Sequence, residues 1–112
     1  MTIADTEPTS PQLDTAALPK GILLVDDHPV FRRGMVALLS EYPEFSVLGE
    51  SCNSKEALEA MRTLNPDVIM VDISLPGISG IELVKLIVAE RPSQLVLMLS
   101  MHDESLYAVR AL

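Results

Sequence analysis

Three aspartates and a serine directly follow short apolar runs of the sequence, and these residue types are suited to metal and phosphoryl chemistry. Asp26 and Asp27 follow the first run, Asp72 follows the third, and Ser100 follows the fourth. Carboxylates that cluster repel one another unless a cation lies between them. Oxygen ligands of this kind suit Mg²⁺, which often also holds a phosphate oxygen. A carboxylate can itself attack phosphorus, and a hydroxyl can then hydrogen-bond the new phosphoryl group.

The apolar runs that precede these residues predict strands buried on both faces of a parallel sheet. They cover residues 21–25, 68–71 and 95–99, and a weaker strand is expected at 45–49, nearer an edge of the sheet. In an open parallel sheet, ligands bind beyond the carboxyl ends of the strands. If the first and third strands are neighbours, Asp26, Asp27 and Asp72 face one another there.

Helical patterns separate the predicted strands. A helix should begin at Pro29 and run to about Glu41, and Asn53 with Glu56 resembles a capping box that opens a second helix. A third helix is expected at 81–90, and a last one from about Asp103 to Leu112. Strands that alternate with helices predict an α/β fold, a doubly wound parallel sheet with helices on both faces.

Three segments resemble the receiver domain of bacterial two-component response regulators. They are DDHPVFRRG after the first strand, VDISLPGISGIEL around Asp72, and LMLSMHDE after the fourth strand. The wording of the first segment is similar to the LuxR-type subfamily, in which a helix-turn-helix domain follows the receiver. The resemblance covers residues 20–112 and implies a flavodoxin-like sheet with strand order 2-1-3-4. Residues 1–19, which contain three prolines among polar residues, are expected to form a flexible leader.

The resemblance also implies roles for individual residues. Asp72 would be the phosphoacceptor, Asp27 a direct Mg²⁺ ligand, and Asp26 a ligand acting mainly through a metal-bound water. Ser74 would offer its backbone carbonyl to the metal, and Ser100 would be the switch hydroxyl. A sensor histidine kinase would be the phosphoryl donor and partner.

The family pattern continues with a fifth parallel strand, which ends in a lysine, and a fifth helix. The chain ends before that unit, so we expect the fold to lack both, and we interpret the sequence as cut short. The fourth strand would then be an exposed apolar edge, which favours a homodimer or a strand-exchanged oligomer. DNA binding would belong to an absent output domain.

Composition narrows the class of protein. The chain has 112 residues, a net charge of −8 and one cysteine. Such an acidic surface repels nucleic-acid phosphates, so this chain alone should not bind nucleic acid. It has no apolar run long enough to span a membrane and no secretory signal pattern, so we expect a cytoplasmic protein.

Other interpretations of the same residues are possible. The fold could serve as a phosphorylation-independent dimerisation or docking module, which the absent lysine and bare sheet edge favour. Aspartate-based phosphatases need Asp-x-Asp after the first strand, and a flavodoxin needs a hydroxyl- and glycine-rich loop there, so neither fits DDHPVF. His28 adjoins the acidic pair but is interpreted as a loop or helix-start residue, because Mg²⁺ sites do not favour imidazole.

Overall fold

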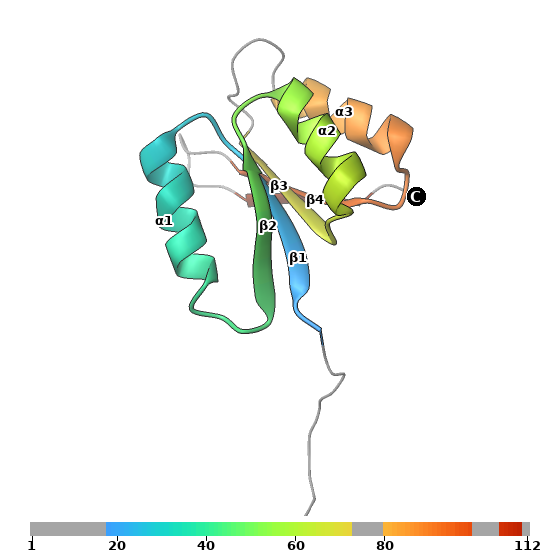
Figure 1. The fold of residues 1–112 in the computed structure, drawn as a ribbon. Coiled ribbons are helices and arrows are strands. Elements are labelled where there is room, and N and C mark those ends of the chain that lie inside the picture. Colours follow the sequence, from blue (N-terminus) through green and yellow to red (C-terminus); the bar gives the residue numbers. More distant parts are fainter. Residues whose placement is uncertain (1–17, 73–79, 100–105, 111–112) are drawn as a thin grey trace, which may run out of the picture.

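The computed structural model describes residues 18–72, 80–99 and 106–110, and these contain alternating strands and helices (Figure 1). The predicted strands and the first three predicted helices are present, most within one or two residues of their expected bounds. The elements in chain order are β1 Lys20–Val25, α1 Pro29–Leu39, β2 Phe45–Ser51, α2 Ser54–Leu64, β3 Val68–Asp72, α3 Gly80–Glu90, β4 Leu95–Leu99 and β5 Leu106–Arg110.

The sheet has the strand order β2-β1-β3-β4-β5. The first four strands are parallel, so the predicted order 2-1-3-4 is confirmed, and β2 lies at the edge as expected. Val25 of β1 lies opposite Val71 of β3 and opposite Ser51 of β2. The carboxyl ends of these three strands therefore lie at the same level, at one edge of the sheet.

The prediction of a last helix from Asp103 to Leu112 is wrong over Leu106–Arg110, which forms β5. This strand runs antiparallel to β4, with Leu97 opposite Ala108. An unpaired strand edge offers a row of free N–H and C=O groups, and the segment LYAVR contains Tyr and Val, two residue types that favour strands. The edge of β4 is therefore paired rather than bare. Because β5 is antiparallel, it is not the fifth parallel strand that the resemblance implies.

Two helices cover one face of the sheet, and α1 covers the other (Figure 1). Alternate residues of β1 point to opposite faces, as expected of a strand. Leu23 and Val25 pack with α2 and α3, whereas Ile22 and Leu24 face α1. The first face contains the larger cluster of buried residues, which are Leu23, Val25, Ala57, Met61, Ile69, Val71, Leu83, Val84, Ile87 and Val96.

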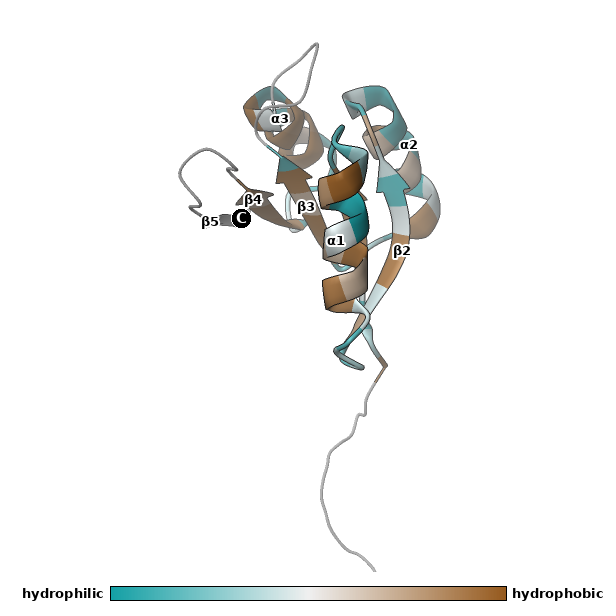
Figure 2. Cartoon of the chain, turned by 90° about the vertical axis from the view of Figure 1, so that its left-hand side faces the viewer, coloured by the Kyte–Doolittle hydropathy of each residue, from teal (hydrophilic) through white to brown (hydrophobic). Residues whose placement is uncertain are grey.

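The α1 face is less completely covered. In Figure 2, α1 lies by itself in front of the sheet. None of its residues is fully buried, and its Met35, Val36 and Leu39 are only partly buried against Ile22, Leu24 and Met70. This helix nevertheless has to place the loop that follows β1, because Asp26 and Asp27 lie between the two elements.

The predicted cap of α2 is confirmed, with one difference. The Asn53 side chain accepts a hydrogen bond from the Glu56 backbone N–H at 2.9 Å. In a capping box the glutamate would accept from the N–H of the cap residue itself. Here Glu56 Oε1 accepts from the Cys52 N–H, one residue earlier, at 3.1 Å.

Candidate metal centre at the carboxyl edge of the sheet

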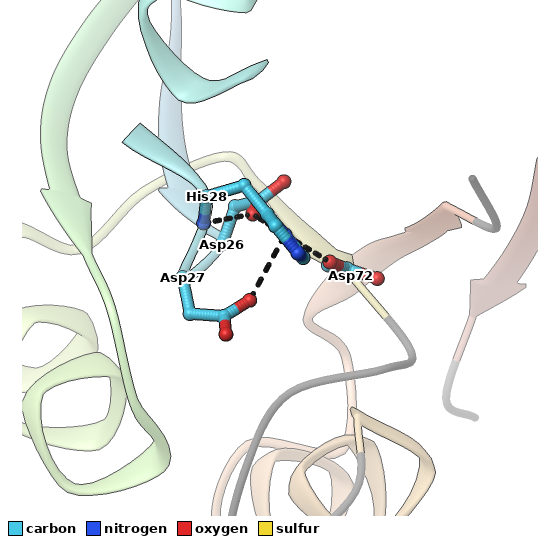
Figure 3. A group of neighbouring side chains, drawn as sticks. All are labelled: Asp26, Asp27, His28 and Asp72. Atoms are coloured by element: carbon cyan, nitrogen blue, oxygen red, sulfur yellow. Dashed lines mark hydrogen bonds and ion pairs between the residues drawn. The ribbon is translucent and has the colours of Figure 1, made fainter. Parts of the chain in front are cut away.

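Asp26, Asp27, His28 and Asp72 converge where β1 and β3 end (Figure 3). Asp72 is the last residue of β3, and Asp26 directly follows β1. Because these strands are neighbours in register, residues 46 positions apart in the sequence meet at this edge. One ligand atom from each of the four residues lies within 4.8 Å of those of the others. The structure thus brings together the three aspartates that the sequence singled out.

Asp26 is almost completely buried, and hydrogen bonds fix both its backbone and its side chain. Its N–H donates to the Ser51 carbonyl at 3.0 Å, and its Oδ1 accepts from the His28 N–H at 2.7 Å. Its Oδ2 is buried and accepts no hydrogen bond from any described residue. Burial raises the pKa of Asp26, the hydrogen bonds from His28 oppose this rise, and the nearby Asp72 adds to it. Burying a charged group without a partner is unfavourable, so this oxygen is suited to a cation.

The other two carboxylates differ in exposure. Asp72 is fully buried, whereas the side chain of Asp27 is 30% exposed and opens toward solvent. The site is therefore closed to water on the side of Asp72 and open to solvent on the side of Asp27.

His28 belongs to this cluster, which the sequence interpretation missed. It is the N-cap residue of α1, as the helix-start interpretation expected. However, its Nδ1 lies 3.0 Å from Asp26 Oδ1, 3.0 Å from Asp27 Oδ1 and 3.5 Å from Asp72 Oδ2. The hydrogen bond with Asp26 and the charges of Asp27 and Asp72 raise the pKa of the imidazole. Its adjacency to two aspartates was the signal that could have placed it here.

The chemistry of the donor set suits Mg²⁺. The three aspartates supply oxygen ligands, which a hard divalent cation prefers to nitrogen. The three carboxylates lie close together. One of their oxygens, Asp26 Oδ2, is buried and has no hydrogen-bond donor among the described residues. The carboxylates therefore fit Mg²⁺, and the half-exposed His28 ring, which lies among the same oxygens, is a positive partner for them only when it is protonated.

Two predicted site residues, Ser74 and Ser100, lie outside the described residues. Their roles as metal-ligating carbonyl and switch hydroxyl therefore remain predictions. In the described part of the chain, no helix is both long enough and apolar enough to cross a bilayer.

Comparison with known proteins decides the family. Residues 22–112 match the response regulator receiver domain. The chain belongs to this family. The chain is 36% identical over 91 residues to the transcriptional regulatory protein DegU of Brevibacillus brevis, covering 81% of this chain and 39% of DegU. It is 42% identical over 64 residues to the nitrate/nitrite response regulator protein NarL of Escherichia coli strain K12, covering 57% of this chain and 30% of NarL.

Solved structures agree with this assignment of the receiver domain. A two-component response regulator of the LuxR family from Aurantimonas matches with a TM-score of 0.73 and 34% identity, covering 76% of this chain and 61% of that one. The receiver domain of NarL from Mycobacterium tuberculosis matches with a TM-score of 0.70 and 34% identity, covering 77% and 69%. The resemblance and the flavodoxin-like fold are thereby confirmed. The chain spans about two fifths or less of the length of DegU and NarL.

Proposed function

We propose that this receiver domain accepts a phosphoryl group on Asp72 in a Mg²⁺-dependent reaction. The observation that carries the proposal is the convergence of Asp26, Asp27 and the buried Asp72 at the ends of neighbouring parallel strands. Membership in the receiver family supports it, because the family takes part in two-component signalling. Asp26, Asp27 and Asp72, with the Ser74 carbonyl, are the proposed metal ligands.

The reaction requires a nucleophile and neutralisation of the negative charge on the phosphoryl oxygens. A carboxylate oxygen of Asp72 forms a bond to phosphorus, while the bond from phosphorus to the donor breaks and the donor leaves with the electron pair. The donor is a histidine kinase phosphoimidazole or a small acyl phosphate. When bound, Mg²⁺ supplies charge neutralisation for the phosphoryl oxygens. The chain's own contribution is to hold Asp72 rigidly at the end of β3 beside Asp26, and to leave Asp27 open to solvent.

The consequence of phosphorylation belongs to the same proposal. The Ser100 hydroxyl would hydrogen-bond the phosphoryl group and bias the protein between two conformations. A sensor histidine kinase is the proposed partner, and a DNA-binding domain the proposed output, in the cytoplasm. One structural relative, RcsB from Salmonella, has been solved bound to promoter DNA with a phosphomimetic beryllofluoride.

The phosphoacceptor is tested by intact mass after incubation with acetyl phosphate and Mg²⁺. The wild-type chain should gain one phosphoryl group, and Asp72→Asn should gain none because it lacks the nucleophilic oxygen. Glu41→Gln is a matched control, since it removes an exposed carboxylate outside the cluster and should leave the mass gain unchanged. An equal gain by wild type and Asp72→Asn would assign the chemistry to another residue. No gain by the wild type would favour the phosphorylation-independent docking module instead.

A further inference from the structure

The side chain of Arg32, on the first turn of α1, makes two hydrogen bonds to residues outside its own helix. Its Nη1 donates to the backbone carbonyl of Asp26 at 2.7 Å, and its Nε donates to Glu50 Oε1 on β2 at 2.9 Å. Only 21% of its side chain is exposed, whereas 41% of the Glu50 side chain is. The guanidinium group is planar, so its orientation is restricted when two acceptors bind it.

These bonds complete the anchoring of the peptide groups around Asp26. The N–H of Asp26 is bonded to the Ser51 carbonyl, and the carbonyl of Asp26 accepts from Arg32. Both bonds depend on adjacent residues of β2. Ser51 accepts directly from the Asp26 N–H, and Glu50 accepts from Arg32 and so orients it. The carbonyl of Asp26 belongs to the peptide group that leads to Asp27. Arg32 therefore restrains the backbone of both acidic residues at once.

We infer that Arg32 is a positioning residue for the metal centre: it fixes the backbone between Asp26 and Asp27 so that their carboxylates are held ready for Mg²⁺. The inference rests on the proposed Mg²⁺ site. Arg32 does not touch the metal ligands' carboxylate oxygens; it acts through the Asp26 carbonyl and is itself held by Glu50. Residues that orient metal ligands in this way commonly change metal affinity when they are replaced.

The sign of the effect separates positioning from simple electrostatics. Arg32 carries a positive charge beside a cluster of carboxylates, so its charge alone disfavours a cation there. If charge were the only influence, Arg32→Gln would strengthen Mg²⁺ binding. If Arg32 positions the loop, the same substitution should weaken Mg²⁺ binding, because the carboxylates lose their fixed arrangement. The two explanations thus predict opposite changes of the dissociation constant.

The experiment is a calorimetric titration of the full chain with Mg²⁺ alone. We expect Arg32→Gln to raise the dissociation constant about tenfold. Arg33→Gln is the matched control, because Arg33 is exposed on the same helix and its side chain makes no hydrogen bond or ion pair with the described residues. It removes the same charge, and screening by salt should keep its affinity within about twofold of wild type.

A second measurement follows the restraint itself. Amide hydrogen exchange without Mg²⁺ should be faster at the His28 N–H in Arg32→Gln than in wild type or Arg33→Gln, because this N–H is bonded within the restrained loop. If Arg32→Gln fails to fold, Arg32→Lys provides the test, since lysine keeps the positive charge but lacks the planar guanidinium group that can donate to two acceptors at once. Weaker Mg²⁺ binding by Arg32→Lys would support positioning, and wild-type affinity would overturn it.

The outcomes distinguish the two claims. If wild type binds Mg²⁺ and Arg32→Gln binds it equally well or more tightly, the positioning role is wrong and the proposed metal site stands. If wild type binds no Mg²⁺, the proposed function itself is overturned, and the inference falls with it.

Discussion

Asp26 is the residue at which folding and the proposed metal binding make opposing demands. Its side chain is only 2% exposed, and its Oδ2 lacks a hydrogen-bond donor among the described residues. Burial and the neighbouring Asp72 raise its pKa, which means that the folded protein favours the neutral carboxyl. A charge kept at this position destabilises the metal-free fold, and the same charge is what a divalent cation requires.

Replacement of Asp26 by Asn should therefore stabilise the metal-free protein. We expect the free energy of unfolding in urea to rise by about 1 kcal/mol, because the amide is neutral and can still accept the His28 N–H. Added Mg²⁺ should stabilise Asp26→Asn less than wild type, since its affinity for the ion is lower. Asp27→Asn is the control, and its metal-free gain should be smaller because Asp27 is partly exposed. A metal-free Asp26→Asn protein less stable than wild type would contradict this argument.

At the scale of elements, an ion pair joins the two helices on the larger core face. Arg62 of α2 donates to both carboxylate oxygens of Glu90 of α3, with Nε–Oε2 at 2.7 Å and Nη2–Oε1 at 2.8 Å. The two-point geometry fixes the helices side by side, although both side chains are partly exposed and the pair is screened by solvent. The hydrogen bonds from Arg62 hold the pKa of Glu90 below its usual value.

This lowered pKa predicts a pH dependence of stability. A carboxyl whose pKa is lower in the folded than in the unfolded protein stabilises the fold above the unfolded value, near 4.5, and this contribution is lost as the pH falls through the folded pKa. Glu90→Gln should therefore melt slightly below wild type at about pH 7, and the difference should be smaller at an acid pH below about 4.5. Thermal unfolding followed by circular dichroism measures it. Glu41→Gln, at an exposed position, should match wild type at both pH values, and a Glu90→Gln deficit that persisted at acid pH would argue for lost packing instead.

At the scale of the whole molecule, the two faces of the sheet differ in how much they bury. Leu83 of α3 is fully buried in the larger cluster, whereas Leu39 of α1 is only partly buried, and Val30 of α1 is 85% exposed. Stability should be distributed in the same way, with α1 the least protected of the described helices. The restraint by Arg32 then has a further structural reason, because weak apolar packing alone does little to fix α1 beside the loop.

A pair of identical substitutions tests this asymmetry. Leu83→Ala should lower the free energy of unfolding by about 2–5 kcal/mol, because it removes a fully buried side chain and leaves a cavity. Leu39→Ala should cost clearly less, since part of the side chain already contacts water. Urea unfolding of both variants gives the comparison. Equal losses would show that α1 is packed as firmly as α3 and that the exposure of its residues does not report its contribution.

Much of the fold could be predicted because its signals are local. Apolar runs gave the strands, Pro29 and Asn53 marked helix starts, and aspartates directly after two runs indicated a shared edge of the sheet. The last segment was mispredicted because its state depends on a distant partner. Residues 106–110 are a strand owing to the edge of β4, and a local pattern carries no information about whether such an edge is available.

The sequence by itself was therefore enough to select the carboxylates that meet at this edge of the sheet, since residue type and position after a buried strand single out Asp26, Asp27 and Asp72. Only the tertiary structure decided how they are held. The pairing of β1 with β3 brings Asp26 to Asp72, the entry into α1 turns the His28 ring into the cluster, and Arg32 reaches Glu50 across 18 positions of sequence. The physical reason is that hydrogen bonds and charges act across space, whereas sequence patterns report only neighbours along the chain.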